Sequence, residues 1–309
     1  MDAARQAAVT LDHVTKRYAA VTALQDVTLN VMPGEMFGLI GPDGAGKTTT
    51  IRLIAGLIPA TSGSVRVFNH DPVADHRSVV TDIGYLSQRF SLYGDLSIDE
   101  NIAFFAEVHG VADYRPRRDR LLELTQLHPF RDRLADQLSG GMKQKLALTC
   151  TLIHEPRLLL LDEPTTGVDP VSRREFWKLL SEFLAQGMTI VMATPYLDEA
   201  ERCRRVALLH NGGVLALDDP SRLRATYPGR ILQIIASPYR EAALLLAALF
   251  PPNDVQSFGE RTHVRLGDED VEVAKARIEQ AFAGGGVALK SARLATPSLE
   301  DVFIERLIS

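Results

Sequence analysis

Short apolar segments with the periods of strands and helices alternate along the first two thirds of the chain. Two segments near the start alternate apolar and polar residues, as half-buried strands do: VTLDHVTKRY (9–18) and ALQDVTLNV (23–31). Three later segments are short and apolar: MFGLIG (36–41), RLLLLDEP (157–164) and MTIVMATP (188–195). The last two have the unbroken apolar runs typical of parallel strands buried on both faces.

Helical periods fill the spaces between these segments. KTTTIRLIAGL (47–57) predicts a helix packed on a sheet, and RVALLHNGGVLALDD (205–219) predicts a hairpin that closes the unit. Strands that alternate with helices predict a doubly wound α/β core. Between Gln88 and Pro156 the strand patterns stop and three helical patterns follow. We therefore expect a helical subdomain, at about residues 89–155, inserted in the core; helices that merely cover the sheet are the alternative.

The pattern changes again from about Pro220. Strand and helix patterns then follow in the order βαββαβ, a split-βαβ arrangement of the ferredoxin-like kind, and SLEDVFIERLI (298–308) predicts a terminal helix. The two inner helices are expected over Arg240–Phe250 and Val271–Ala283. The sequence thus predicts two domains, residues 1–219 and a smaller α+β domain over residues 220–309.

A glycine-rich segment between a strand and a helix carries the clearest chemistry. GPDGAGKTT (41–49) matches the pattern G-x-x-x-x-G-K-[ST], in which backbone N–H groups and a helix N-terminus surround phosphates. The lysine reaches the outer phosphates, and the first threonine hydroxyl can ligate Mg²⁺. The candidate nucleotide-binding residues of this segment are Gly41, Pro42, Asp43, Gly44, Ala45, Gly46, Lys47, Thr48 and Thr49.

Two further motifs supply what phosphoryl transfer needs. In LLLLDEP (158–164), Asp162 can hold Mg²⁺ and Glu163 can accept a proton from an attacking water. In LSGGMKQ (138–144), a serine and two glycines at a helix N-terminus form a second anion site, for which an ordinary helix cap is the alternative. One phosphate loop plus a second phosphate-binding helix end predicts a dimer in which each chain completes the other's site. The candidate residues of that helix end are Ser139, Gly140 and Gly141.

Composition excludes several other classes of protein. Apolar residues make up 46% and charged residues 24% of the chain, as in ordinary globular proteins. A net charge of -5, with one short basic stretch that we expect to be a solvated helix face (Arg115, Arg117, Arg118 and Arg120), argues against nucleic acid as a partner. The two cysteines suggest buried thiols rather than a disulfide or metal site. No apolar run approaches the roughly 20 residues that span a bilayer. We expect a cytoplasmic location, with any membrane role exercised through a partner.

The motifs together resemble the nucleotide-binding subunit of an ATP-binding cassette (ABC) transporter. GPDGAGKTT, Gln88, LSGGMKQ, LLLLDEP and GVDP occur in the family's order and at its spacing over residues 9–218. The tail PSLEDVFIERL (297–307) is similar to that of type-2 exporter ATPases in the drug- or sodium-efflux branch, and the chain resembles the first cassette of bacterial two-cassette efflux ATPases. The resemblance implies an α/β P-loop NTPase core with an inserted helical subdomain, and ATP and Mg²⁺ as cofactors.

The resemblance also assigns roles to single residues. It implies that Tyr18 stacks on adenine and that Gln88, at the joint between core and helical subdomain, touches Mg²⁺ or the attacking water. Ser139 and Gly141 would bind the γ-phosphate held by the opposite chain, and Asp169 would lie near that chain's phosphate loop. The implied activity is ATP hydrolysis, coupled to export through membrane permease subunits at the inner face of the cell membrane.

Two residues depart from the family's pattern. Pro195 occupies the place of a histidine that contacts the γ-phosphate, and proline has neither a side-chain donor nor an N–H. We expect Thr194 to cap the following helix and Pro195 to take its first position. Asp43 replaces the usual Asn or Ser and would approach Asp169 of an identical partner, a like-charge contact. A slow site and pairing with a second, different cassette chain follow, although a homodimer is possible.

Two other functions stay open from the sequence. The first is a soluble ABC protein acting on ribosomes or DNA; such relatives carry two linked cassettes or an interrupting coiled coil, and this sequence shows neither. The second is a regulatory module that holds ATP without turning it over, which Pro195 favours and Glu163 argues against.

Overall fold

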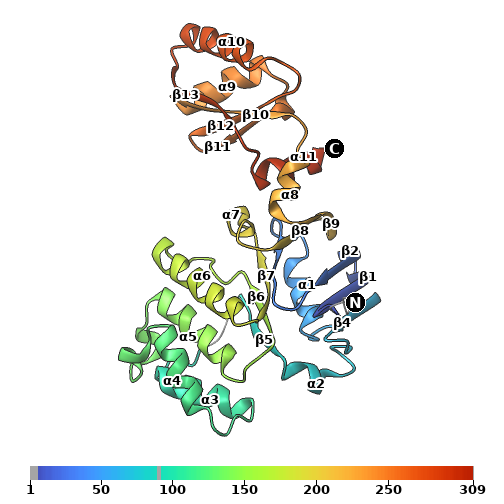
Figure 1. Ribbon diagram of the computed structural model, residues 1–309, viewed down its shortest axis with the longest axis vertical. Helices are drawn as coiled ribbons and strands as arrows, with labels where there is room; N and C mark the ends of the chain where they lie inside the picture. The colour runs from blue at the N-terminus through green and yellow to red at the C-terminus, as the bar shows by residue number, and fades with distance from the viewer. Residues whose placement is uncertain (1–5, 89–91, 309) are drawn as a thin grey trace, which may run out of the picture. The chain divides into compact units, whose positions relative to one another are not determined.

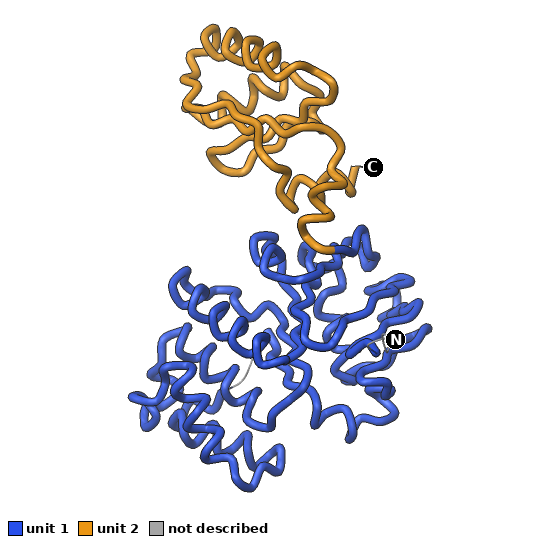
Figure 2. The backbone as a smooth tube through the Cα atoms, in the orientation of Figure 1, with its two compact units in different colours: residues 1–218 blue, residues 219–309 orange. Residues whose placement is uncertain are grey.

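The computed structural model describes residues 6–88 and 92–308. It divides the chain into two compact units, residues 1–218 and 219–309 (Figure 2). The expected start of the helical subdomain at residue 89, and the expected domain ends at residues 1 and 309, lie outside the described residues.

A six-stranded sheet forms the centre of the first unit (Figure 1). Its strand order is β5-β6-β7-β3-β8-β9, in which the first five strands are parallel and β9 pairs antiparallel with β8 at the edge. The strands are β3 (Met36–Ile40), β5 (Ile83–Leu86), β6 (Leu158–Asp162), β7 (Thr189–Thr194), β8 (Arg205–His210) and β9 (Gly213–Asp218). Every residue of β3, β6 and β7 is buried, which confirms the predicted buried parallel strands and the α/β core.

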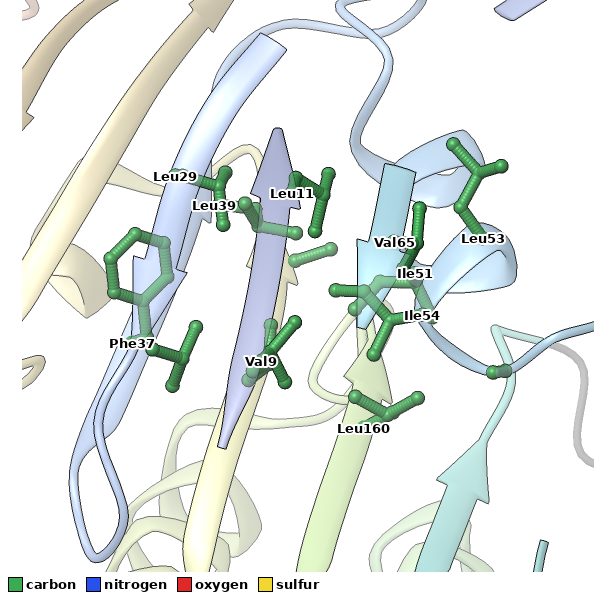
Figure 3. Close-up of a cluster of buried hydrophobic side chains, with 14 of the residues drawn as sticks. Val9, Leu11, Leu29, Phe37, Leu39, Ile51, Leu53, Ile54, Val65 and Leu160 are labelled. Atoms are coloured by element: carbon green, nitrogen blue, oxygen red, sulfur yellow. The ribbon is translucent and has the colours of Figure 1, made fainter. Parts of the chain in front are cut away.

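A second sheet, antiparallel and three-stranded, packs on the same core. Its order is β2-β1-β4, with β1 (Val9–Tyr18), β2 (Val21–Val31) and β4 (Ser62–Val67). Figure 3 shows side chains of this sheet (Val9, Leu11) meeting side chains of β3 (Phe37, Leu39) and α1 (Ile51) in one buried cluster. Helix α1 (Lys47–Ile54) therefore begins at a position fixed by both sheets.

The predicted helical subdomain is confirmed. It lies between β5 and β6, which are neighbours in the sheet, and contains α3 (Ile98–Val108), α4 (Arg115–Leu124) and α5 (Gly140–Leu152) with two 3₁₀ turns (His128–Phe130 and Ala135–Gln137). A capping box of Ser97 and Glu100 starts α3, and α3 and α4 pack on α5 (Figure 1).

One expectation about α4 is wrong. Arg115 and Arg120 are exposed, but Arg117 and Arg118 do not belong to a solvated face. The Arg117 guanidinium lies 2.6 Å from the Glu155 carboxylate, and that of Arg118 lies 3.2 Å from the Asp99 carboxylate. These ion pairs attach α4 to its neighbours, so the basic stretch is structural.

The remaining helices of the first unit cover the sheet or connect its strands. They are α2 (His76–Val80), α6 (Pro170–Ala185) and α7 (Leu197–Ala200). Cys150 and Cys203 are buried free thiols, as expected, and burial raises the pKa of both. Across residues 6–88 and 92–308, no helix combines the length and apolar character required to cross a membrane.

The second unit is built on a four-stranded antiparallel sheet. Its strands are β10 (Arg230–Ser237), β11 (Val255–Phe258), β12 (Arg261–Leu266) and β13 (Ala288–Ala295), in the order β11-β12-β10-β13. Helices α9 (Tyr239–Leu249) and α10 (Val271–Gly284) pack on it, and α8 (Pro220–Ala225), a 3₁₀ turn (Pro252–Asp254) and α11 (Leu299–Ile308) complete the unit. Counted within the unit, the strand order is 2-3-1-4, which confirms the ferredoxin-like prediction.

Candidate nucleotide-binding site

The glycine-rich segment joins β3 to α1, as the sequence predicts. Gly46 is the N-cap of α1, with φ at 104°, a conformation that glycine adopts without steric cost. A Cβ at Gly46 would lie 2.5 Å from Leu24 Cδ2, and one at Gly41 would collide with the carbonyl oxygen of Leu209. Both glycines are therefore required for the loop to pass close to its neighbours while its backbone stays open to a ligand.

Lys47 is drawn into this loop. Its side chain is 3% exposed, and Nζ donates to the carbonyl oxygens of Gly41 (2.9 Å) and Pro42 (3.0 Å). The same nitrogen lies 3.4 Å from Glu163 Oε1. A buried ammonium held mainly by neutral carbonyls is suited to an anionic ligand, because phosphate oxygens make stronger charge-assisted hydrogen bonds.

Thr48 and Asp162 form the candidate Mg²⁺ site. Thr48 Oγ1 donates to Asp162 Oδ1 at 2.9 Å, which brings the start of α1 to the end of β6. Burial raises the pKa of Asp162, against the hydrogen bond from Thr48, which lowers it. A desolvated carboxylate beside a hydroxyl fits Mg²⁺, which prefers oxygen ligands and takes few of them from protein. Gln88 is the third predicted Mg²⁺ ligand. Its amide donates a hydrogen bond to the carboxylate of Glu163, the residue after Asp162.

Glu163 follows Asp162 directly and has an unusual backbone. Its φ is 51°, in the left-handed region that non-glycine residues rarely adopt. Its N–H donates to the carbonyl oxygen of Ala193 on β7 at 2.9 Å, and Gln88 Nε2 donates to its carboxylate at 3.0 Å. This geometry directs the Glu163 side chain toward Lys47 and the phosphate loop, where a general base is needed.

Lys47, Thr48, Gln88 and Glu163 open onto one cavity of about 650 Å³. It is lined by nine of the predicted residues: Tyr18, Asp43, Gly44, Gly46, Lys47, Thr48, Thr49, Gln88 and Glu163. It is also lined by Pro195 and by five residues without a predicted role, namely Val21, Thr22, Ala23, Thr166 and Tyr196. The only sequence signal for a role of these five residues is that they lie close in the sequence to Tyr18, Glu163 and Pro195. Gly41, Pro42, Ala45 and Asp162 do not line the cavity.

Ser139, Gly140 and Gly141 do not line that cavity. They start α5, where Ser139 Oγ accepts a hydrogen bond from the Met142 N–H at 3.3 Å. A Cβ at Gly141 would lie 2.5 Å from Ser172 Cβ, at the start of α6. The close approach of two helix starts is therefore a packing reason for Gly141, whereas Gly140 has open space and no such reason.

Two expectations for the segment around Pro195 are wrong: Thr194 is not the helix cap, and Pro195 is not the first helical residue. Helix α7 begins at Leu197, and its N-cap is Tyr196 rather than Thr194. Thr194 Oγ1 accepts a hydrogen bond from the Tyr196 N–H but donates its own hydrogen to buried Glu199, at 2.6 Å. The threonine therefore turns inward, and Pro195 lies before the helix, on the cavity wall.

The two aspartates of the expected like-charge contact differ in environment. The Asp43 side chain is 96% exposed at the mouth of the phosphate loop. Asp169 is the N-cap of α6, and hydrogen bonds from Ser172 lower its pKa, so it is ionised at neutral pH. Neither carboxylate is neutralised by an ion pair shorter than 4.0 Å among the described residues.

Comparison with known proteins shows the family to which this chain is similar. Residues 24–166 match the ABC transporter family model. The probable multidrug ABC transporter ATP-binding protein YbhF of Escherichia coli (strain K12) is 40% identical over 97% of this chain, which spans about half (52%) of that protein's length. The daunorubicin resistance ATP-binding protein DrrA3 of Streptomyces coeruleorubidus is 34% identical over 96% of this chain and 95% of its own length.

Solved structures give the same family over 71% and 68% of this chain. An ATP-binding subunit of an ABC transporter superposes with a TM-score of 0.65 and 31% identity, over 71% of this chain and 92% of that one. The dimeric bacterial ABC transporter cassette MJ0796 superposes with a TM-score of 0.62 and 29% identity, over 68% of this chain and 98% of that one.

Proposed function

The chain belongs to the ABC transporter family, and we propose that it is the ATP-hydrolysing subunit of an efflux transporter. The observation that carries this proposal is that Lys47, Thr48, Glu163 and Gln88 line one cavity and that Asp162 is hydrogen-bonded to Thr48. Relatives named as a probable multidrug ABC transporter ATP-binding protein and as a daunorubicin resistance ATP-binding protein support efflux as the process. Membrane permease subunits would carry the substrate, and this chain would act at the inner face of the membrane.

The site's own residues divide the work of hydrolysis. Lys47 would exchange its carbonyl partners for the outer phosphates of ATP. Thr48 and Asp162 would hold Mg²⁺, which would supply charge neutralisation for the transferring phosphate. Glu163 takes a proton from the attacking water, and Gln88 holds the Glu163 carboxylate in place through its amide. Tyr18, 42% exposed at the cavity wall, offers a ring on which adenine can stack.

The serine–glycine start of α5 would act on a second chain. Ser139, Gly140 and Gly141 lie outside this chain's cavity but present backbone N–H groups at a helix N-terminus, which suits an anion. We infer that they contact the γ-phosphate bound by a partner cassette. ATP would then join two cassettes, and closure of that dimer would drive the permeases.

The partner is proposed to be a different cassette chain. Pro195 lines the cavity without a side-chain donor, so this chain's own site would be slow, whereas the start of α5 can complete a working site on the partner. In a homodimer, Asp43 would approach the ionised Asp169 of the other copy, which costs free energy in a desolvated interface. A homodimer would form only against that repulsion.

The second unit, residues 219–309, is proposed to fold separately and to serve assembly or regulation. It carries no phosphate-binding motif, and all the residues that line the candidate site belong to residues 1–218.

Binding and hydrolysis of Mg-ATP by the purified chain test the proposal. Lys47→Ala should abolish detectable binding of a fluorescent ATP analogue, because the buried ammonium is the site's strongest hydrogen-bond donor to phosphate. Glu163→Gln should retain binding and lose turnover. Lys178→Ala, on an exposed position of α6, is the matched control. Unchanged affinity in Lys47→Ala would contradict the assignment of the phosphate loop.

A further inference from the structure

A buried carboxylate outside the cavity connects the two segments that carry Glu163 and Pro195. The Glu199 side chain, on the short helix α7, is 1% exposed. It accepts four hydrogen bonds, from Thr165 Oγ1 (2.5 Å), Thr194 Oγ1 (2.6 Å), Arg173 Nε (2.8 Å) and Trp177 Nε1 (3.4 Å). A desolvated carboxylate with this many donors is held in one orientation, and it holds its donors in turn.

The position of these donors in the chain makes the contact informative. Thr165 lies two residues after Glu163, and Thr194 immediately precedes Pro195, so one carboxylate clamps the loop after β6 to the end of β7. The backbone bond from Glu163 to Ala193 is a second tie between the same two segments. Arg173 and Trp177 anchor the junction to α6.

We propose that Glu199 is a positioning residue for hydrolysis, which sets the direction of the Glu163 side chain and the place of residue 195 on the cavity wall. The proposal rests on the proposed function of this site. A general base must stand within hydrogen-bond reach of the water it activates, and a displacement of about 1 Å can cost about 100-fold in rate. The left-handed backbone of Glu163 is tied through its N–H to Ala193 on β7, and Glu199 holds the end of that strand through Thr194, so a change at Glu199 can reach the base.

A purely structural role is the alternative, in which Glu199 only neutralises Arg173. Arg173 has a second carboxylate partner, since its Nη2 donates to both oxygens of Asp198 at 3.0 and 2.9 Å. The Asp198 side chain is 72% exposed. Asp198→Asn therefore perturbs the same arginine without touching Thr165 or Thr194, and it is the matched control.

The decisive variants are at Thr165, because they leave the buried charge in place. Thr165→Val removes the hydroxyl at almost constant volume, and Thr165→Ser restores it. With Mg-ATP, and with partner subunits where they are available, we expect Thr165→Val and Glu199→Gln to lower kcat by about 10- to 100-fold while KM and ATP affinity change less than about 2-fold. Thr165→Ser and Asp198→Asn should keep kcat within about 2-fold of the parent chain.

Trp177, the chain's single tryptophan, gives a readout that does not require turnover. Its indole N–H bonds to Glu199, so we expect Mg-ATP binding to change Trp177 fluorescence in the parent chain and in Thr165→Ser, and to change it much less in Thr165→Val. This signal decides the positioning role even if the parent chain proves not to hydrolyse ATP, an outcome that would instead count against the proposed function.

Normal kcat together with a normal nucleotide-induced fluorescence change in Thr165→Val would overturn the proposal. An equal loss of kcat and ATP affinity in Glu199→Gln, with Thr165→Val unaffected, would likewise show that Glu199 serves only to pair Arg173.

Discussion

The stacked pair of His109 and His154 makes the first unit sensitive to acid. The two rings lie 3.9 Å apart and nearly parallel, at 8°. His154 Nε2 bonds to the carbonyl oxygen of Ile83 at 3.0 Å, whereas its buried Nδ1 has no hydrogen-bond partner among the described residues. A second proton on this ring would therefore be buried, unpaired and next to another imidazole. Burial, with a smaller contribution from His109, lowers the pKa of His154 from 6.5 to about 4.

The sign of the effect follows from which state binds the proton first. As pH falls below 6.5 the unfolded chain takes up a proton at His154, while the folded chain resists until about pH 4. This residue's contribution to stability is thus present above pH 6.5 and is lost as the pH falls toward 4. The difference of about 2.5 in pKa corresponds to about 3 kcal/mol at its limit, of which about 2 kcal/mol is lost at pH 5.

Urea unfolding at pH 7.5 and pH 5.0 measures this loss. Trp177 lies in the first unit, so its fluorescence follows the unfolding of that unit alone. We expect the free energy of unfolding of His154→Gln to fall by about 2 kcal/mol less than that of the parent chain between the two pH values. His128→Gln, at an exposed histidine of the same subdomain, should behave as the parent chain does. The same pH dependence in His154→Gln and the parent chain would refute the reasoning.

Three further predictions concern other parts of the chain. Pro195→His should raise the hydrolysis rate of the chain's own site by about 100-fold, because it restores a donor to the transferring phosphate; brisk hydrolysis by the parent chain with no gain from histidine would make Pro195 a structural detail. A truncation that ends at Asp219 should bind Mg-ATP with unchanged Kd, and a folded truncation without binding would contradict the separate second unit. Asp301→Ala should destabilise the second unit by about 2–3 kcal/mol, because it leaves the buried His263 ring and Ser298 without their hydrogen-bond acceptor. Circular dichroism should then show an unfolding transition at lower denaturant concentration that Trp177 fluorescence does not follow.

The elements that the sequence predicts best are those whose apolar pattern is complete by itself. The four leucines of β6 are fully buried, and Asp162 follows the fourth directly. The same short segment therefore predicts both the strand and a residue of the site. β4 was not predicted, because only Val65 and Val67 of its six residues are buried and its pattern is too short to detect. α6 is not among the predicted elements either, although it carries buried apolar residues at helical spacing.

The candidate site divides in the same way. Lys47, Thr48 and Glu163 belong to contiguous motifs whose chemistry follows from local sequence. Glu199 does not, since its donors Thr165 and Arg173 lie 34 and 26 residues away and meet it only in the folded chain. The expected helix cap at Thr194 is wrong for the same reason. The local sequence favours a cap, but the Thr194 hydroxyl donates its hydrogen to the buried carboxylate of Glu199, five residues later.

The left-handed backbone of Glu163 has a consequence for attempts to engineer this protein. A non-glycine residue at φ 51° costs roughly 1–2 kcal/mol, and glycine at this position would recover much of it. Variants selected for heat resistance or expression yield are therefore expected to accumulate replacements at residue 163, and the best-behaved members of such a library would be those that have lost the base. A selection that varies residue 163 therefore has to assay ATP turnover from the first round, because the replacement that stabilises the fold removes the catalytic carboxylate.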